Sequence, residues 1–290
     1  MTGATPSALL DLARSLAERA GALLVEAGGD GRGRDLGAAA TRKSSRTDLA
    51  TDADRASEAL VRAGILDERP DDAILGEEGG EHTGRSGLTW IVDPLDGTTN
   101  FVYGFPAWCV SIAVADPAGV VAGVVHDPLR SETFTATRGG GAFLGGDRLH
   151  LGPPPPLAEA LVGTGFGYDP ERRRQQAALL PRLLPAIRDI RRAGSAALDL
   201  CWVAAGRLDA FYEAGLQPWD LSAGLLVAGE AGADHVWLPG PVEVPTLVVG
   251  DGALVGSLAG VLAGVLATGP TGPPAGGGSP PGPPGAAAPG

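Results

Sequence analysis

The chain has 290 residues, of which 44 % are hydrophobic and 19 % charged, a composition typical of a globular protein with a sizeable core. Its formal net charge of −12 argues against nucleic acid or an anionic membrane as the main partner. Two cysteines without a CxxC pattern and four scattered histidines predict neither a disulfide framework nor a zinc site. No basic region leads into an apolar stretch near residue 1, so we expect a cytoplasmic protein without a signal peptide.

The first half of the chain predicts helices followed by antiparallel strands. Apolar residues recur at helical spacing over residues 7–27, and Thr5-Pro6 offers an N-cap and a proline at the first helical position. Residues 28–50 are rich in glycine, arginine and serine, which predicts a loop or a mobile hairpin. A second helix should run from just after Thr51 to about Ile65. Short strands should follow at 72–75, 88–92, 109–115, 120–126, 133–137 and 141–144.

The second half predicts strands that alternate with helices. The strands are expected at residues 160–163, 208–213 and 246–250, and the helices at residues 172–187, 195–205, 221–231 and 252–266. Pro181 and Pro185 should break the first of these helices early. After Thr268 the chain is almost entirely glycine, proline and alanine, so we expect residues 269–290 to form a disordered tail without a catalytic role.

Four acidic segments stand out, and three of them lie where a strand ends or a helix begins. They are Thr51-Asp52-Ala53-Asp54, Gly76-Glu77-Glu78-Gly79, Asp93-Pro94-Leu95-Asp96-Gly97-Thr98-Thr99 and Trp219-Asp220. Carboxylates at such boundaries are near solvent and often line a cleft. Their joint occurrence favours a shared acidic site over four separate structural uses.

The third segment carries the most chemical information. Pro94 should fix a tight turn after the strand, across which Asp93 and Asp96 can converge. Two carboxylates held together repel unless a cation neutralises them, and hard oxygen ligands select Mg²⁺, Mn²⁺ or Ca²⁺. Gly97 lets the backbone approach a ligand closely, and a helix that starts at Thr98 offers free N–H groups to a phosphate.

Each acidic residue also has a purely structural interpretation. Asp96 and Asp220 are suitable helix caps, and Asp54 lies at capping-box distance from Thr51. A bare acidic cluster also serves calcium storage. From residue chemistry alone, metal binding is therefore the prediction, and phosphatase chemistry is one use of it.

The same segments resemble the signatures of the inositol monophosphatase family. Residues 90–101 are similar to its first signature, and residues 219–224, followed by 229–232, to its second. Gly76-Glu77-Glu78 matches its upstream glutamate motif, and residues 43–54 resemble its N-terminal segment. Order and spacing agree from about residue 8 to about residue 267.

This resemblance implies a fold and a division of the chain. It implies an α+β fold, the layered αβαβα sandwich of the inositol monophosphatase and fructose-1,6-bisphosphatase type, usually a homodimer and inhibited by lithium in many members. The phosphatase domain would span residues 1–268. An N-terminal half to about residue 152 would carry the metal motifs, and a C-terminal α/β half would follow.

The resemblance also implies roles for single residues. Two or three Mg²⁺ ions, which Mn²⁺ could replace, would be held by Glu77, Asp93, the carbonyl of Leu95, Asp96 and Asp220. Glu77 would also help to position a weaker third ion, and Thr98, with Asp54 behind it, would activate the attacking water. Gly97 and Thr98 would hold the phosphate, and the substrate would be bordered by Asp96, Ser195, Ala196, Glu213 and Asp220.

The predicted activity is Mg²⁺-dependent hydrolysis of a small polyol or sugar phosphate by metal-activated water, with inositol 1-phosphate as the leading substrate. Histidinol phosphate, fructose 1,6-bisphosphate and adenosine 3′,5′-bisphosphate stay open as alternatives, as does a non-catalytic protein that binds metal or sugar phosphate. Arg191 and Arg192 precede the loop at Gly194, where they could favour a second anionic group or simply lie at the surface.

Overall fold

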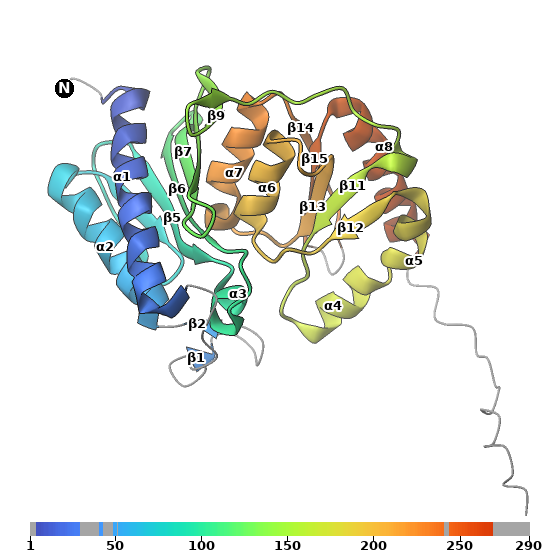
Figure 1. Ribbon diagram of the computed structural model, residues 1–290, viewed down its shortest axis with the longest axis horizontal. Coiled ribbons are helices and arrows are strands. Elements are labelled where there is room, and N and C mark those ends of the chain that lie inside the picture. The colour runs from blue at the N-terminus through green and yellow to red at the C-terminus, as the bar shows by residue number, and fades with distance from the viewer. Residues whose placement is uncertain (1–3, 30–40, 43–48, 51, 241–243, 269–290) are drawn as a thin grey trace, which may run out of the picture.

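Five layers stack in the order helix, sheet, helix, sheet, helix (Figure 1). The computed structural model describes residues 4–29, 41–42, 49–50, 52–240 and 244–268. Helices α1 (Pro6–Leu24) and α2 (Asp52–Glu68) form the first layer. Helices α6 (Ala196–Ala204) and α7 (Pro218–Glu230) lie between the sheets, and α5 (Leu180–Leu183) and α8 (Gly252–Thr268) cover the far side. This arrangement confirms the predicted layered αβαβα fold.

The larger sheet has eight strands, of which only β3 and β5 pair in parallel. In spatial order they are β10 (Asp147–Arg148), β9 (Gly141–Leu144), β8 (Glu132–Thr137), β7 (Gly119–Asp127), β6 (Cys109–Asp116), β5 (Thr89–Asp96), β3 (Ala73–Gly76) and β4 (Gly80–His82). The central strands β6 and β7 have nearly continuous apolar sequences, because α1 covers one face of the sheet and α7 covers the other.

The smaller sheet has five strands and mixed pairing. Its order is β12 (Asp189–Arg191), β11 (Leu161–Thr164), β13 (Ala210–Ala214), β15 (Thr246–Gly250) and β14 (Asp234–Leu238). A separate two-stranded ribbon joins β1 (Thr41–Arg42) to β2 (Leu49–Ala50), which places a short antiparallel pair within the segment predicted as a loop or hairpin. Residues 73–148 supply the larger sheet and residues 161–250 the smaller one, while the proposed two-half division itself stays a prediction.

Local sequence explains how α1 begins and packs. The Thr5 hydroxyl accepts the Ala8 N–H and Pro6 occupies the first turn, as expected. Leu9 and Leu16 are buried in the core that α1 shares with α2 and the larger sheet. A Cβ at Gly64 of α2 would lie 2.3 Å from the Leu16 Cδ2 atom, so the two helices approach closely there.

Two helices differ from their predicted extents. The segment 172–187 contains α4 (Pro170–Ala177), α5 and a 3₁₀ turn (Leu184–Ala186), which confirms the early break near the two prolines. Helix α7 begins at Pro218 rather than at Leu221, so Asp220 is the third helical residue and not the N-cap. Its carboxylate accepts the N–H of the true cap, Gln217, at 2.6 Å.

Two of the predicted segments, the N-terminal family segment and the C-terminal tail, extend beyond the described residues. Residues 43–48, Thr51 and the proposed tail 269–290 lie outside the described residues. Across the ranges that are described, no helix combines the length and the apolarity needed to cross a bilayer.

Candidate active site

Strand β5 places the central acidic segment by means of a bulge. The strand was expected to end at Asp93-Pro94, but it continues to Asp96. Asp93 pairs with Ser111 of β6 and Asp96 with Cys109, so two residues lie opposite one. Pro94 falls inside this irregularity, where a strand tolerates the missing N–H. The predicted tight turn is therefore a β-bulge, and it puts two carboxylates three residues apart on the same side of the strand.

A cavity of about 430 Å³ lies beside this bulge. Residues from every predicted motif in the described chain line it except the one at Asp54. The predicted site residues among its lining are Glu77, Asp93, Leu95, Asp96, Gly97, Thr98, Ala196, Glu213 and Asp220. Asp54 and Ser195 are not among the lining residues; both are buried directly behind it.

The carboxylates of the cavity strongly influence one another. Burial raises the pKa of Asp93 well above its usual range, and the charges of Glu77, Asp96 and Asp220 raise it further. The pKa of Asp96 is raised to about 6, because burial outweighs the hydrogen bonds from Ser195 and Ala197, which lower it. The site therefore concentrates negative charge that a cation would relieve.

The donor set suits a hard divalent cation. It consists of carboxylate oxygens and a backbone carbonyl, the ligands that Mg²⁺ and Mn²⁺ prefer. Within the described ranges, no three His, Cys, Asp or Glu side chains converge closely enough to enclose an ion as they stand. The carboxylates thus share one cavity without enclosing a single point. They repel one another, and a bound cation would relieve that repulsion.

Thr98 and Asp54 form the hydrogen-bonded pair that the resemblance implied. The Thr98 hydroxyl donates to Asp54 Oδ1 at 2.9 Å, with the Leu95 carbonyl a second acceptor at 3.2 Å. Asp54 is fully buried in the first turn of α2, and Thr98 opens α3 (Thr98–Tyr103). Two segments 44 residues apart in the chain are thereby brought together at the cavity.

Helix α2 holds two further loops of the site, which sequence reasoning did not predict. Ser57 donates to the Pro94 carbonyl at 2.9 Å. Glu58, only 2 % exposed, accepts the N–H groups of Glu78 and Gly79 at 2.7 and 2.8 Å. Asp54, Ser57 and Glu58 share one helix face at i, i+3 and i+4. This polar triplet above the buried Val61 and Ile65 is the signal that could have revealed them.

The Glu58 carboxylate also explains the glycines that flank Glu77. A Cβ at Gly76 or at Gly79 would lie 2.4 Å from Glu58 Oε1, closer than a carbon atom can approach. The glycines in this motif therefore serve the close approach of α2, and the position of Glu77 at the cavity depends on that contact.

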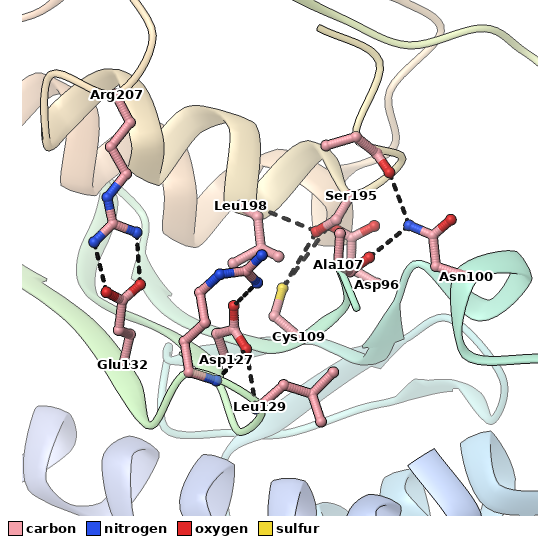
Figure 2. Close-up of polar contacts among 12 residues, drawn as sticks. Asp96, Asn100, Ala107, Cys109, Asp127, Leu129, Glu132, Ser195, Leu198 and Arg207 are labelled. Carbon is pink, nitrogen blue, oxygen red and sulfur yellow. Dashed lines mark hydrogen bonds and ion pairs between the residues drawn. The ribbon is translucent and has the colours of Figure 1, made fainter. Parts of the chain in front are cut away.

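Asp96 is fixed from the opposite side by α6. Figure 2 shows the Ser195 hydroxyl beside Asp96 and the sulfur of Cys109. Ser195 Oγ donates to Asp96 Oδ2 at 2.7 Å, and the Ala197 N–H donates to the same oxygen at 2.8 Å. Ser195 is also the N-cap of α6, where it accepts the Leu198 N–H. Its observed contact is thus with a predicted metal ligand.

A tight turn after the bulge is possible because residue 97 is glycine. Gly97 has a φ of 103°, and a Cβ there would lie 3.0 Å from the Ala107 carbonyl oxygen. Asn100 of α3 then donates to the carbonyls of Ala107 and Ala193 at 2.5 and 2.8 Å (Figure 2). This amide connects α3 to the segment before β6 and to the segment before α6, a role that was not predicted.

Glu213 lies on the wall contributed by the smaller sheet. A Cβ at Gly165 would meet the Glu213 carboxylate at 2.0 Å, so only glycine leaves room for it. The pKa of Glu213 is raised to about 8, first by burial and then by the charge of Asp220, while the charge of Arg192 acts in the opposite direction. Glu213 therefore combines hydrogen-bond donor and acceptor capacity near neutral pH.

The two cysteines do not form a disulfide with each other. Cys109 and Cys201 are both buried and free, as expected, and burial raises the pKa of each thiol well above its usual range.

Glu78, which had no predicted role, contributes its backbone N–H to Glu58.

Comparison with known proteins agrees with the geometry. A model of the inositol monophosphatase family matches residues 6–268. An inositol-1-monophosphatase of Mycobacterium bovis is 46 % identical over 241 residues, which cover 79 % of this chain and 83 % of that protein. A Xylella fastidiosa protein named Nus factor SuhB is 45 % identical over 192 residues, covering 66 % and 69 %.

Solved structures resemble the chain over most of its length. The crystal structure of the extragenic suppressor protein SuhB from Bartonella henselae matches with a TM-score of 0.80 at 34 % identity, covering 88 % of this chain and 98 % of that one. An inositol monophosphatase from Thermotoga maritima matches with a TM-score of 0.77 at 31 % identity, covering 89 % and 98 %.

Proposed function

The chain belongs to the inositol monophosphatase family, and from that premise we propose that it is a Mg²⁺-dependent phosphatase acting in the cytoplasm as a homodimer. Its proposed substrate is a phosphate monoester of a small polyol or sugar, with inositol 1-phosphate leading. One observation carries the proposal: five carboxyl side chains line one cavity together with a threonine whose hydroxyl is hydrogen-bonded to a buried aspartate.

The metal-binding part of the proposal rests on the carboxylates of that cavity. Glu77, Asp93, Asp96, Asp220 and the Leu95 carbonyl would hold two or three Mg²⁺ ions, with Mn²⁺ a possible substitute. When bound, these ions would supply an activated water and neutralise the charge that develops on the leaving oxygen. Ser195 and Ala197 would keep one oxygen of Asp96 in place, which fixes the direction of the other.

Thr98 and Asp54 would direct the attacking water. Because the Thr98 hydroxyl donates toward Asp54, the threonine oxygen can accept a hydrogen bond from water in the cavity. As the water attacks phosphorus, a proton can pass to Thr98 while the threonine proton moves to Asp54. Water is then the nucleophile, and the reaction needs no covalent intermediate.

The remaining residues would hold the substrate. The N–H groups of Gly97 and Thr98 would donate to the phosphate oxygens, and Ala196 would border the alcohol. Glu213, with a pKa of about 8, would exchange hydrogen bonds with a substrate hydroxyl without adding a full charge at neutral pH. Such a wall fits a polyol.

The test is phosphate release by the purified protein with Mg²⁺, with and without EDTA. Inositol 1-phosphate would be compared with histidinol phosphate, fructose 1,6-bisphosphate and adenosine 3′,5′-bisphosphate. We expect turnover that EDTA abolishes, and a substrate that leads by about tenfold in kcat/KM, or about 1.4 kcal/mol, identifies the enzyme. Turnover that survives EDTA refutes the metal-dependent mechanism.

A non-catalytic role is the second candidate, because some relatives bear the name Nus factor SuhB. The presence of Asp54, Glu77, Asp93, Thr98 and Asp220 around one cavity favours catalysis, since a binding surface does not need a water-activating pair. No phosphate release from any of these substrates with Mg²⁺ or Mn²⁺ would support the non-catalytic role.

A further inference from the structure

We propose that Arg172 and Arg192 form a second anion subsite in the active-site cavity, for phosphate monoesters whose alcohol carries a second phosphate or a carboxylate. This inference rests on the proposed phosphatase function and extends its substrate class beyond neutral polyols. Both arginines line the cavity that contains the acidic residues, although they come from α4 and from the loop before α6.

Most of the arginines that the structure describes lie close to a carboxylate. Eleven are within ion-pair distance of an aspartate or glutamate in the described chain: Arg14, Arg55, Arg62, Arg69, Arg85, Arg130, Arg138, Arg174, Arg188, Arg191 and Arg207. The guanidinium groups of Arg172 and Arg192 make no ion pair and no hydrogen bond with any residue that the structure describes; the one hydrogen bond from Arg172 to a side chain comes from its backbone N–H, to Asp169. In a chain with a net charge of −12, two such cations in one acidic cavity suggest anion binding.

Glycines shape the path of the Arg172 side chain. A Cβ at Gly167 would lie 2.7 Å from Arg172 Cδ, and one at Gly215 would lie 2.8 Å from Arg172 Nη1. The side chain therefore passes over the backbone at Gly167, and its guanidinium lies against the backbone at Gly215, two residues after Glu213. Since Glu213 packs on Gly165 and Arg172 on Gly167, the two side chains are neighbours along the same wall.

Arg192 reaches the same cavity from the loop before α6. A Cβ at Gly194 would lie 2.5 Å from Arg192 Nη1, and Gly194 has a φ of 97°. The charge of Arg192 acts on several carboxyls: burial raises the pKa values of Asp96, Asp199 and Glu213, and Arg192 lowers all three. Its guanidinium therefore lies close to the acidic centre, although the residue is exposed.

The chemistry of the two side chains defines the ligand. A guanidinium presents a planar fork of N–H donors that matches phosphate and carboxylate, and it stays protonated at every working pH. An alcohol that extends past Glu213 would bring its far end to Arg172. A second anionic group there gains charge-assisted hydrogen bonds, whereas the ammonium group of histidinol phosphate is repelled.

The kinetic test compares substrates with and without the second anion. Arg172→Gln, Arg192→Gln and the double variant would be assayed on fructose 1,6-bisphosphate and inositol 1-phosphate at saturating Mg²⁺. We expect each single variant to lose about tenfold in kcat/KM on the bisphosphate, mainly through KM. On inositol 1-phosphate the change should be less than about twofold.

Two neighbouring arginines provide matched controls. Arg173 and Arg191 adjoin the proposed residues, are exposed, and do not line the cavity. Arg173→Gln and Arg191→Gln change the net charge by the same amount and should leave both substrates unaffected. Equal losses on both substrates in the proposed-site variants would mean that the arginines hold the reacting phosphate, and unchanged bisphosphate kinetics would mean that they hold nothing; either outcome overturns the subsite.

A binding measurement separates this inference from the phosphatase proposal. Fructose 6-phosphate would be titrated into EDTA-treated protein, in which the unneutralised carboxylates disfavour a phosphate at their own end of the cavity. We expect calorimetry or NMR to show binding that weakens by about tenfold or more in the double variant and at high salt. If the protein releases no phosphate but the double variant still binds fructose 6-phosphate more weakly than wild type, the subsite is supported and the phosphatase proposal fails. Equal affinity of wild type and double variant refutes the subsite, even if turnover is observed.

Discussion

Thr98 and Thr99 are adjacent residues of the same type, but their hydroxyls differ in hydrogen bonding. Thr98 donates to Asp54 at 2.9 Å, whereas the buried Thr99 hydroxyl has no hydrogen-bond partner among the described residues. Losing the first hydroxyl would remove a hydrogen bond to a fully buried aspartate, and losing the second would remove only an unsatisfied group. The pair thus offers a direct comparison of catalytic and structural effects.

Thr98→Val should lower kcat by about 100-fold or more, because the attacking water loses its acceptor and the route to Asp54. The Mg²⁺ concentration that gives half-maximal activity should stay within about threefold of wild type, since Thr98 is not a proposed ligand. Thr98→Ser should restore most of the activity. Steady-state phosphate release at varied Mg²⁺ measures all three.

Thr99→Val is the control for that substitution. It should retain wild-type turnover and equal or higher thermal stability, because a buried hydroxyl without a partner is replaced by a methyl group. A similar loss of kcat in both variants would show that the Thr98 effect comes from disturbing α3 rather than from the hydroxyl.

The sequence predicted site residues where the chemistry was carried by a motif, and missed those that act through the fold. Nine predicted residues line one cavity, as the spacing of the acidic motifs and the family resemblance led us to expect. Glu58 and Arg172 were not predicted because each contacts backbone far away in the chain, Glu58 at Glu78 and Arg172 at Gly215. A glutamate on a helix gives no sign in the sequence that it caps a distant loop.

At the scale of elements, α2 acts as the frame of the acidic site. One face of this helix holds Thr98 through Asp54, the bulge through Ser57 and the Glu77 loop through Glu58. The helix is packed on the larger sheet through Val61 and Ile65, so the three segments that it holds are fixed relative to that sheet.

Glu58→Gln should weaken metal binding without changing the chemistry. The amide NH₂ would face the N–H groups of Glu78 and Gly79, so the loop that carries Glu77 would lose a hydrogen bond. We expect the Mg²⁺ concentration for half-maximal activity to rise about tenfold while kcat at saturating Mg²⁺ stays near wild type. Glu68→Gln, at the exposed end of the same helix, is the matched control. An unchanged metal requirement would contradict this role of α2.

In the two large sheets, the described strands that were not predicted at all lie at the edges. The unpredicted strands β4, β10, β12 and β14 are the four edge strands of the two large sheets. Strand β14 illustrates the reason, since four of its five residues are exposed. A strand that is buried on neither face does not need the apolar pattern from which strands are recognised, whereas the inner strands β6 and β7 show it over most of their length.

The bulge in β5 was also beyond prediction from the pattern alone. The Asp93-Pro94 pair indicated a strand end, because proline interrupts a ladder. Pairing with β6 resumes at Asp96, and only that tertiary contact shows the segment to be a strand.

At the scale of the whole molecule, the active-site cavity stores unfavourable electrostatic free energy when no metal is present. Burial is the largest cause of the raised pKa values of Asp93, Asp96 and Glu213, which reach about 6 for Asp96 and about 8 for Glu213. Between pH 4 and these values the folded protein keeps protons that the unfolded chain releases. This contribution to stability is therefore complete below about pH 4 and is lost as pH rises through 6 and 8.

The metal-free protein should consequently melt at a lower temperature at pH 8 than at pH 5. We expect Tm in EDTA to fall by about 5 °C across this range, and added Mg²⁺ to raise Tm more at pH 8 than at pH 5. Glu213→Gln should flatten the part of the curve between pH 6 and 8. Differential scanning calorimetry measures both effects, and a Tm in EDTA that rises from pH 5 to pH 8 would contradict the assignment.

The proposed phosphatase activity depends on the carboxylates gathered at the β5 bulge, which would hold the metal. Its most direct test is Mg²⁺-dependent phosphate release from inositol 1-phosphate by Asp93→Asn, beside Asp116→Asn, which removes an aspartate paired with Arg138 outside the cavity. We predict that Asp93→Asn loses turnover by about 1,000-fold or more while its circular dichroism spectrum stays that of the wild type, and that Asp116→Asn retains activity. Near-normal turnover of folded Asp93→Asn would contradict the claim.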